Sequence, residues 1–125
     1  MYYVGIDAHK EMCQTTVMNE NGRVVERRKV PTRLADLKEF FKKYRGSKAV
    51  LESSTVWEFV YETVPGEGVE VVLANPSQVK AISQARIKTD KVDSETLAHL
   101  LRADLIPEAY IAPPEIWILP VSSSG

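Results

Sequence analysis

Two apolar, β-rich runs that each close on a single carboxylate constrain the fold of this 125-residue chain most strongly. The first run, Tyr2–His9, carries Asp7, and the second, Lys48–Leu51, is followed at once by Glu52. An ionised carboxylate inside an apolar strand is costly unless it is paired or used. Ligand sites of α/β sheets lie at the carboxyl ends of the strands. If the two strands lie parallel and side by side, Glu52 projects near Asp7 at this edge of the sheet.

The order of the other elements predicts a mixed sheet with helices packed on it. Strands are expected at Met12–Met18 and Arg23–Val30, joined by a tight turn at Asn19–Gly22, so the first three strands form an antiparallel meander. Helical spacing of apolar residues follows in Arg33–Tyr44 and again before a fifth strand, Val69–Ala74. The nearly continuous apolar run of the fifth strand predicts a central position. The fold class is thus α/β, a mixed five-stranded sheet with element order βββαβαβ followed by helices.

A second pair of acids, Asp90 and Asp93, lies where a helix spanning Asp90–Asp104 is predicted to begin. Acids at positions i and i+3 share one helix face, and the first helical turn favours negative charge. Each acid could instead simply cap the helix. Carboxylate oxygens suit Mg²⁺ or Mn²⁺ better than zinc, and paired ions of this kind assist phosphoryl displacement. His9 and His99 are expected to be surface or core residues rather than ligands.

The basic residues are unevenly distributed although the net charge is only −1. Ten of the sixteen lie between Arg23 and Lys48, and a second basic segment spans Lys80–Lys91. These segments offer a polyanion local footholds, although lysines in the first are also typical of the solvated face of an amphipathic helix. The chain has no apolar run long enough to span a membrane and no signal peptide pattern. The single cysteine, Cys13, cannot form an internal disulfide, which fits a reducing cytoplasm, and it is expected to be a buried apolar residue.

Three segments resemble one known family: GIDAHK, LESS and, most specifically, NPSQVKAISQARIKTDKVDSETLA. Over roughly Tyr2–Ile116 the chain is similar to the N-terminal domain of insertion sequence 110 family transposases. The resemblance implies an RNase H-like fold similar to the Holliday-junction resolvase RuvC. It also implies a catalytic, Mg²⁺- or Mn²⁺-binding DEDD tetrad made of Asp7, Glu52, Asp90 and Asp93. The activity it implies is metal-dependent DNA cleavage and strand exchange during transposition, by homo-oligomers assembled on DNA and guided by an RNA from the element.

The chain departs from the family pattern at two positions near the acids and in its length. Thr55 stands where glycine is usual and Ser94 where alanine is common, and neither change touches the tetrad. The second family domain, which bears a serine nucleophile, is not in this sequence, and nothing beside Ser122–Ser124 would activate a replacement. We expect residues 1–112 to form the RNase H-like catalytic domain and residues 113–125 a linker or disordered tail. Basic residues near the acids are predicted to bind nucleic acid: Lys80, Arg86, Lys88 and Lys91.

Other interpretations remain open from the sequence. The chain could be a free-standing endonuclease of the resolvase type, or a catalytically silent module that uses its basic segments for nucleic-acid binding or its helices for oligomerisation. An actin-like ATPase also begins with a Gly-Ile-Asp motif, but 125 residues cannot supply its two lobes. For each nuclease or binding role, a cytoplasmic location in a prokaryote is expected.

Overall fold

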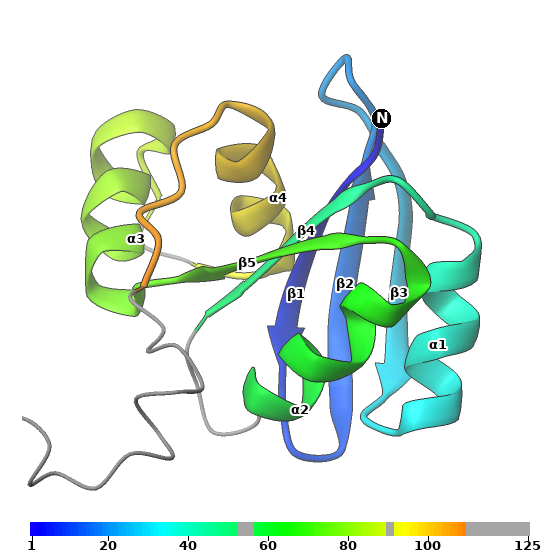
Figure 1. Cartoon of the computed structure of the whole chain (residues 1–125). Helices are drawn as coiled ribbons and strands as arrows, with labels where there is room; N and C mark the ends of the chain where they lie inside the picture. The colour runs from blue at the N-terminus through cyan, green and yellow to red at the C-terminus, as the bar shows by residue number, and fades with distance from the viewer. Residues whose placement is uncertain (53–56, 90–91, 110–125) are drawn as a thin grey trace, which may run out of the picture.

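The computed structural model describes residues 1–52, 57–89 and 92–109 (Figure 1). Its five strands form one sheet in the order β3-β2-β1-β4-β5. The pairings β1–β2 and β2–β3 are antiparallel, whereas β1–β4 and β4–β5 are parallel. The predicted mixed sheet and the order βββαβαβ are therefore confirmed. The strands are β1 (Tyr3–Ala8), β2 (Met12–Met18), β3 (Val24–Pro31), β4 (Lys48–Glu52) and β5 (Glu70–Ala74).

Helices cover both faces of this sheet (Figure 1). One face packs against α1 (Leu34–Lys42), α2 (Trp57–Thr63) and the 3-10 helix Val64–Glu67, and we call it the α1 face. The opposite face packs against α3 (Pro76–Ile82) and α4 (Ser94–Arg102), and we call it the α4 face. A π-helical turn, Ser83–Ile87, follows α3. Each face thus has its own apolar core.

The alternation of side chains along β1 decides which face Asp7 occupies. Val4 and Ile6, both 0% exposed, belong to the core of the α1 face. Tyr3 packs into the core of the α4 face, and Gly5 lies under α4. Because successive strand residues point to opposite faces, Asp7 lies on the α4 face. Cys13 on β2 is buried in the α1-face core, as predicted.

The fifth strand was predicted to be central, and this is wrong: β5 is an edge strand. Its outer edge is partly covered by residues 107–109. The N–H of Asn75 donates to the carbonyl of Pro107 at 2.9 Å, and that of Ala109 donates to the carbonyl of Leu73 at 2.8 Å. An isolated antiparallel bridge joins Ala74 and Glu108. This segment pairs backbone groups of the edge, whereas the apolar side chains of β5 pack into both cores: Val71 and Leu73 on the α1 face, and Val72 and Ala74 on the α4 face.

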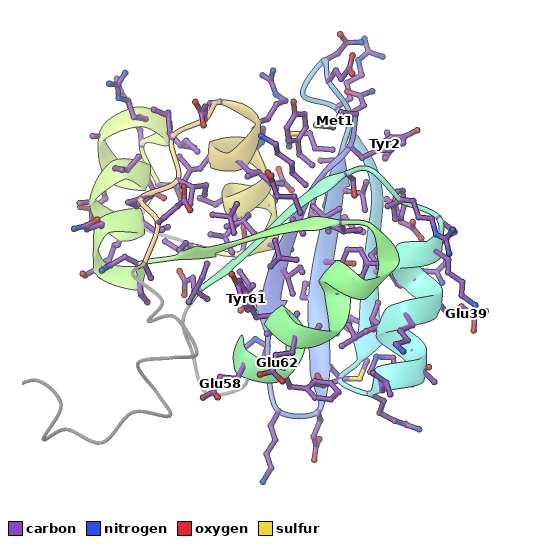
Figure 2. All side chains as sticks on the ribbon, viewed as in Figure 1. Met1, Tyr2, Glu39, Glu58, Tyr61 and Glu62 are labelled. Carbon is purple, nitrogen blue, oxygen red and sulfur yellow. The ribbon has the colours of Figure 1, made fainter. Side chains whose placement is uncertain are left out.

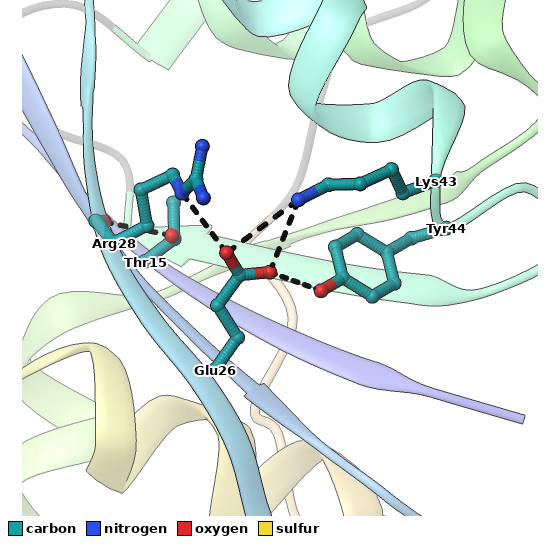
Figure 3. Close-up of polar contacts among 5 residues, drawn as sticks. All are labelled: Thr15, Glu26, Arg28, Lys43 and Tyr44. Carbon is teal, nitrogen blue, oxygen red and sulfur yellow. Dashed lines mark hydrogen bonds and ion pairs between the residues drawn. The ribbon is translucent and has the colours of Figure 1, made fainter.

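A polar cluster fixes the end of α1 to β3 (Figure 3). The hydroxyl of Tyr44 donates to Glu26, whose carboxylate also pairs with Arg28 at 2.9 Å and with Lys43 at 3.4 Å. The hydrogen bond from Tyr44 is the largest of the causes that lower the pKa of Glu26, and the two cations add to it. Part of the basic segment Arg23–Lys48 is therefore neutralised inside the fold.

Acidic side chains of the α1 face lie at its outer surface. Figure 2 shows Glu39 on α1 and Glu58 and Glu62 on α2 pointing away from the sheet. These helices are amphipathic, with Leu37, Phe40 and Phe41 of α1 buried beneath them. Across residues 1–52, 57–89 and 92–109, each helix is too short or too polar to cross a membrane.

Candidate active site

The parallel pairing of β1 with β4 brings Asp7 next to Glu52. The two strands advance in step, and the last recorded pair is Ile6 with Leu51. One residue further along each strand are Asp7 and Glu52. Because adjacent in-register positions point to the same side of a sheet, both carboxylates lie on the α4 face. The parallel pairing on which the meeting of these two acids depends is thus present.

The electrostatics of Glu52 show that the two carboxylates interact. Burial is the largest cause that raises the pKa of Glu52, and the negative charge of Asp7 raises it further. Both causes make the ionised pair unfavourable in the absence of a counter-charge. Carboxylate oxygens are the donors that Mg²⁺ and Mn²⁺ prefer, so this pair fits a divalent cation.

His9 lies just after β1 and contacts one of these acids. Its Nε2 is 3.2 Å from Oδ2 of Asp7, and the two side chains are 66% and 38% exposed. His9 was expected to be a surface or core residue rather than a ligand, and it lies at the surface; its contact with Asp7 was not predicted. A side chain that holds one carboxylate oxygen limits the rotamers of Asp7.

The start of α4 approaches the sheet closely at Gly5. A Cβ built on Gly5 would lie 1.8 Å from the carbonyl oxygen of Ser94 and 2.8 Å from the backbone nitrogen of Ala98. Only glycine permits this approach. A glycine inside a strand is a sequence signal for such close packing, and this signal was not used to predict the site. The hydroxyls of Thr16 and Ser94 also share a buried hydrogen bond of 2.7 Å.

A second tie holds the same end of α4. Nη2 of Arg27 on β3 is 2.6 Å from Oε1 of Glu95. The first turn of α4 is therefore held against β1, β2 and β3 on the face that carries Asp7. Its contact with β1 is at Gly5, two residues before Asp7.

The helix predicted to begin at Asp90 begins at Ser94, and that prediction is wrong. Asp93 is the N-cap residue, and its Oδ1 accepts the N–H of Thr96 at 3.0 Å. Asp93 therefore precedes the first helical residue of α4. The close packing of the start of α4 on Gly5 positions Asp93. Asp90 lies outside the described residues.

The four acids of the predicted tetrad are thus only partly placed. Asp7 and Glu52 are neighbours, and Asp93 caps the helix that packs two residues away from Asp7 on the same face. Within the described part of the chain, no three His, Cys, Asp or Glu side chains gather closely enough to hold a metal ion. Because Asp90 is outside that part, the tetrad remains a prediction.

A cleft of about 620 Å³ opens beside Asp7 on the hairpin formed by β1 and β2. It extends across the sheet to β3. The cleft is lined by Asp7, His9, Lys10, Glu11, Met12, Gln14 and Lys29. Of these residues, only Asp7 was predicted from the sequence to belong to the site.

The basic residues predicted to bind nucleic acid come from the α3 side of the molecule. Lys80 on α3, Arg86 in the π-helical turn and Lys88 after it are all exposed. Lys88 has a left-handed backbone with φ of 61°, which ends the π-helical turn. Lys91 lies outside the described residues. The role of these four residues in nucleic-acid binding stays a prediction.

Comparison with known proteins identifies a transposase family. The family model described as Transposase, of the DEDD type of insertion sequence 110, matches residues 4–116. A curated relative, the transposase for insertion sequence element IS1533 of Leptospira borgpetersenii, is 27% identical over 106 residues. That match covers 81% of this chain but 31% of the relative, so the chain spans about a third of the relative's length.

Solved structures of Holliday junction resolvases share the fold. RuvC of T. thermophilus in complex with a Holliday junction substrate aligns with a TM-score of 0.59 and 13% identity, over 87% of this chain and 99% of that one. A second Thermus thermophilus RuvC structure gives 0.53 and 20%, over 91% and 85%. The fowlpox virus Holliday junction resolvase gives 0.52 and 11%, over 83% and 96%. The predicted RuvC-like, RNase H-like fold is therefore confirmed.

Proposed function

The chain belongs to the insertion sequence 110 family of DEDD transposases, and from this premise we propose that it is the metal-binding catalytic-site domain for DNA strand cleavage and transfer in transposition. The observation that carries the proposal is the placement of Asp7 beside a half-buried Glu52 whose pKa is raised by burial and by the charge of Asp7. Such a pair is stabilised by a bound cation and disfavoured without one. The domain is proposed to comprise residues 1–112.

We assign Asp7, Glu52, Asp90 and Asp93 as the ligands of Mg²⁺ or Mn²⁺. Two of them are supported by their adjacency on parallel strands, and Asp93 by the close docking of α4 at Gly5. Asp90 is assigned from the family motif alone. When bound, the cation would supply charge stabilisation for an in-line displacement at a phosphodiester.

The chain's own residues perform the positioning. β1 and β4 hold the first two carboxylates in register, and His9 restrains Asp7 through a contact of 3.2 Å. The hydrogen bond between Thr16 and Ser94 fixes the distance of α4 from the sheet and hence the place at which Asp93 begins the helix. Preorganised ligands of this kind lose little entropy when they bind an ion.

DNA is the partner that we propose for this site. One structural neighbour, RuvC, has been solved in complex with a Holliday junction substrate, which supports a DNA substrate here. Lys80, Arg86, Lys88 and Lys91 are proposed to contact its phosphates. Homo-oligomerisation of the full-length protein, an element-encoded guide RNA and a location in the bacterial cytoplasm are further expectations from the family.

The proposal is tested by binding and cleavage of labelled branched and linear DNA in Mg²⁺, Mn²⁺ or EDTA. Wild type, Asp7→Asn and Glu52→Gln are compared with Asp36→Asn, which removes a partly exposed carboxylate from α1 on the other face. We expect divalent cations to strengthen DNA binding in wild type and Asp36→Asn but not in the two site variants. DNA binding by all four proteins that is the same with divalent cations as in EDTA would contradict the proposal and favour a catalytically silent module. Cutting of branched DNA by the chain alone would instead favour a resolvase-type endonuclease.

A further inference from the structure

One row of residues crosses three strands at the mouth of the candidate site. The antiparallel register pairs Asp7 on β1 with Gln14 on β2, and Gln14 with Lys29 on β3. Directly opposed residues of neighbouring strands point to the same face. Asp7, Gln14 and Lys29 therefore form a continuous cross-strand row on the α4 face, with an acid, an amide and an amine in succession.

The next cross-strand row on the same face is in contact with residues of α4. It consists of Gly5, Thr16 and Arg27, in the same register. Gly5 lies under Ser94, Thr16 bonds the hydroxyl of Ser94, and Arg27 pairs with Glu95. Thus each residue of this row contacts the first turn of α4.

The row of Asp7, Gln14 and Lys29 is instead open. All three residues line the cleft of about 620 Å³ beside the hairpin. The cleft therefore begins where the cover of α4 ends, and it leads from the acids to the edge of the sheet.

Two side chains of this row, Gln14 and Lys29, make no ion pair or side-chain hydrogen bond within the described residues, whereas Asp7 contacts His9. Of the three consecutive basic residues in β3, Arg27 pairs with Glu95 and Arg28 with Glu26. Lys29 is exposed and makes no ion pair within the described part of the chain. The amide of Gln14 is half-buried and likewise forms no side-chain hydrogen bond among the described residues. A half-buried amide and an unpaired amine aligned in one cleft suit an anionic ligand with several acceptor oxygens.

We propose that this cleft holds the sugar–phosphate backbone of the DNA strand next to the phosphate being cleaved. The inference rests on the proposed function, because the acids define where cleavage occurs. Gln14 donates its amide N–H groups to a backbone oxygen, and Lys29 neutralises a neighbouring phosphate. The Cα atoms of Asp7 and Lys29 are separated by two strand spacings, about 10 Å. At roughly 3.4 Å of rise per nucleotide, this span corresponds to at most about three nucleotides of one B-form strand.

The charges around the row agree with this occupant. Lys10 also lines the cleft and, like Lys29, makes no ion pair within the described residues. Glu11 is the acid of the cleft besides Asp7, and it lies exposed in the turn between β1 and β2. If Asp7 binds a cation, the amines of Lys10 and Lys29 in the same cleft remain available to bind a polyanion.

Lys29 lies on an edge strand and also borders a second groove, of about 590 Å³, between β3 and α1. Lys42 lines the second groove but not the first. Lys42→Ala is therefore the matched control: it removes the same charge from the competing groove.

The test is the salt dependence of binding to a short fluorescein-labelled single-stranded DNA, followed by anisotropy with Ca²⁺ as the cation. Lys29→Ala should reduce the slope of log Kobs against log[salt] by about 0.7, the value for one lost phosphate contact on a single strand. Gln14→Ala should weaken binding about threefold to tenfold without changing the slope, because the amide is neutral. Lys42→Ala should match wild type in both respects.

Each remaining outcome decides the inference. Wild-type behaviour of both Lys29→Ala and Gln14→Ala would overturn it, and so would a flattened slope in Lys42→Ala with none in Lys29→Ala. No DNA binding by wild type would overturn both the cleft and the proposed function. A Mn²⁺ titration run in parallel separates the two: if Asp7→Asn binds Mn²⁺ like wild type, the proposed function fails whatever the lysine variants show.

Discussion

Replacing Gly5 with alanine tests the claim that a close approach of α4 builds the site. The added Cβ would lie 1.8 Å from the carbonyl oxygen of Ser94, whereas real Cβ contacts essentially never fall below 3.0 Å. The start of α4 must therefore move away by about 1.2 Å to reach that limit. Such a shift would also stretch the 2.7 Å hydrogen bond between Thr16 and Ser94 beyond bonding distance.

The expected loss of stability follows from these two effects. Overpacking of this kind costs about 1–3 kcal/mol, and a lost hydrogen bond adds about 1 kcal/mol. Alanine regains up to about 1 kcal/mol because it loses less backbone entropy in a strand than glycine does. We therefore expect Gly5→Ala to lower the free energy of unfolding by about 1–3 kcal/mol in urea denaturation, and to weaken Mn²⁺ binding because Asp93 moves with the helix.

Gly66→Ala is the matched control. A Cβ on Gly66 meets no heavy atom within 4 Å, and its backbone does not need a positive φ. Its free energy of unfolding should stay within about 0.5 kcal/mol of wild type. If Gly5→Ala also stays within that margin and binds Mn²⁺ normally, the reasoning about α4 is refuted.

Two further substitutions probe the charged groups. The folded state raises the pKa of Glu52, so its ionisation destabilises the fold as the pH rises above the ordinary value of 4.5. In EDTA at neutral pH, Glu52→Gln should therefore melt at a higher temperature than wild type, and the difference should vanish below pH 4.5. The same variant should bind Mn²⁺ at least about tenfold more weakly than wild type. A Glu52→Gln protein that is less stable than wild type at neutral pH would contradict the repulsion between Glu52 and Asp7. The pKa of Glu26 is lowered in the fold, so its stabilisation is present above 4.5 and is lost as the pH falls through the folded value. Glu26→Gln should lower the free energy of unfolding at neutral pH by about 1–2 kcal/mol in urea melts and leave DNA binding unchanged; no loss would mean that the bonds to Tyr44, Arg28 and Lys43 contribute nothing.

The sheet and the adjacency of two acids were predictable because they depend on local patterns. An acid that closes an apolar run is visible in the sequence, and the helix between the third and fourth strands allows the fourth to lie parallel to the first. These two facts place Asp7 beside Glu52 without any knowledge of distant contacts.

The start of α4 was not predictable in the same way. Asp90 and Asp93 are both acceptable N-cap residues, so local preference does not choose between them. The choice agrees with tertiary contacts, since Ser94 bonds Thr16 and lies over Gly5, on strands more than 70 residues away in the chain. Tertiary contacts also explain the error over β5, because the apolar side chains of this edge strand are packed into the cores on both faces of the sheet.

The row formed by Asp7, Gln14 and Lys29 could not be predicted from the sequence, for a different reason. Gln14 and Lys29 are ordinary residues of half-exposed strands, and only the register of two antiparallel pairings aligns them with Asp7. A shift of one residue in either pairing would send them to opposite faces. The pairing of Arg27 and Arg28 with acids, which leaves Lys29 alone, depends on side-chain contacts that no sequence pattern encodes.

The most direct test of the central claim is calorimetric titration of the chain with Mn²⁺, comparing wild type, Asp7→Asn and Asp36→Asn. We predict that wild type and Asp36→Asn bind the ion with the same affinity and that Asp7→Asn does not bind it measurably. Binding by Asp7→Asn with wild-type affinity, or no binding by wild type, would contradict the claim that these carboxylates form a divalent-metal site in this domain.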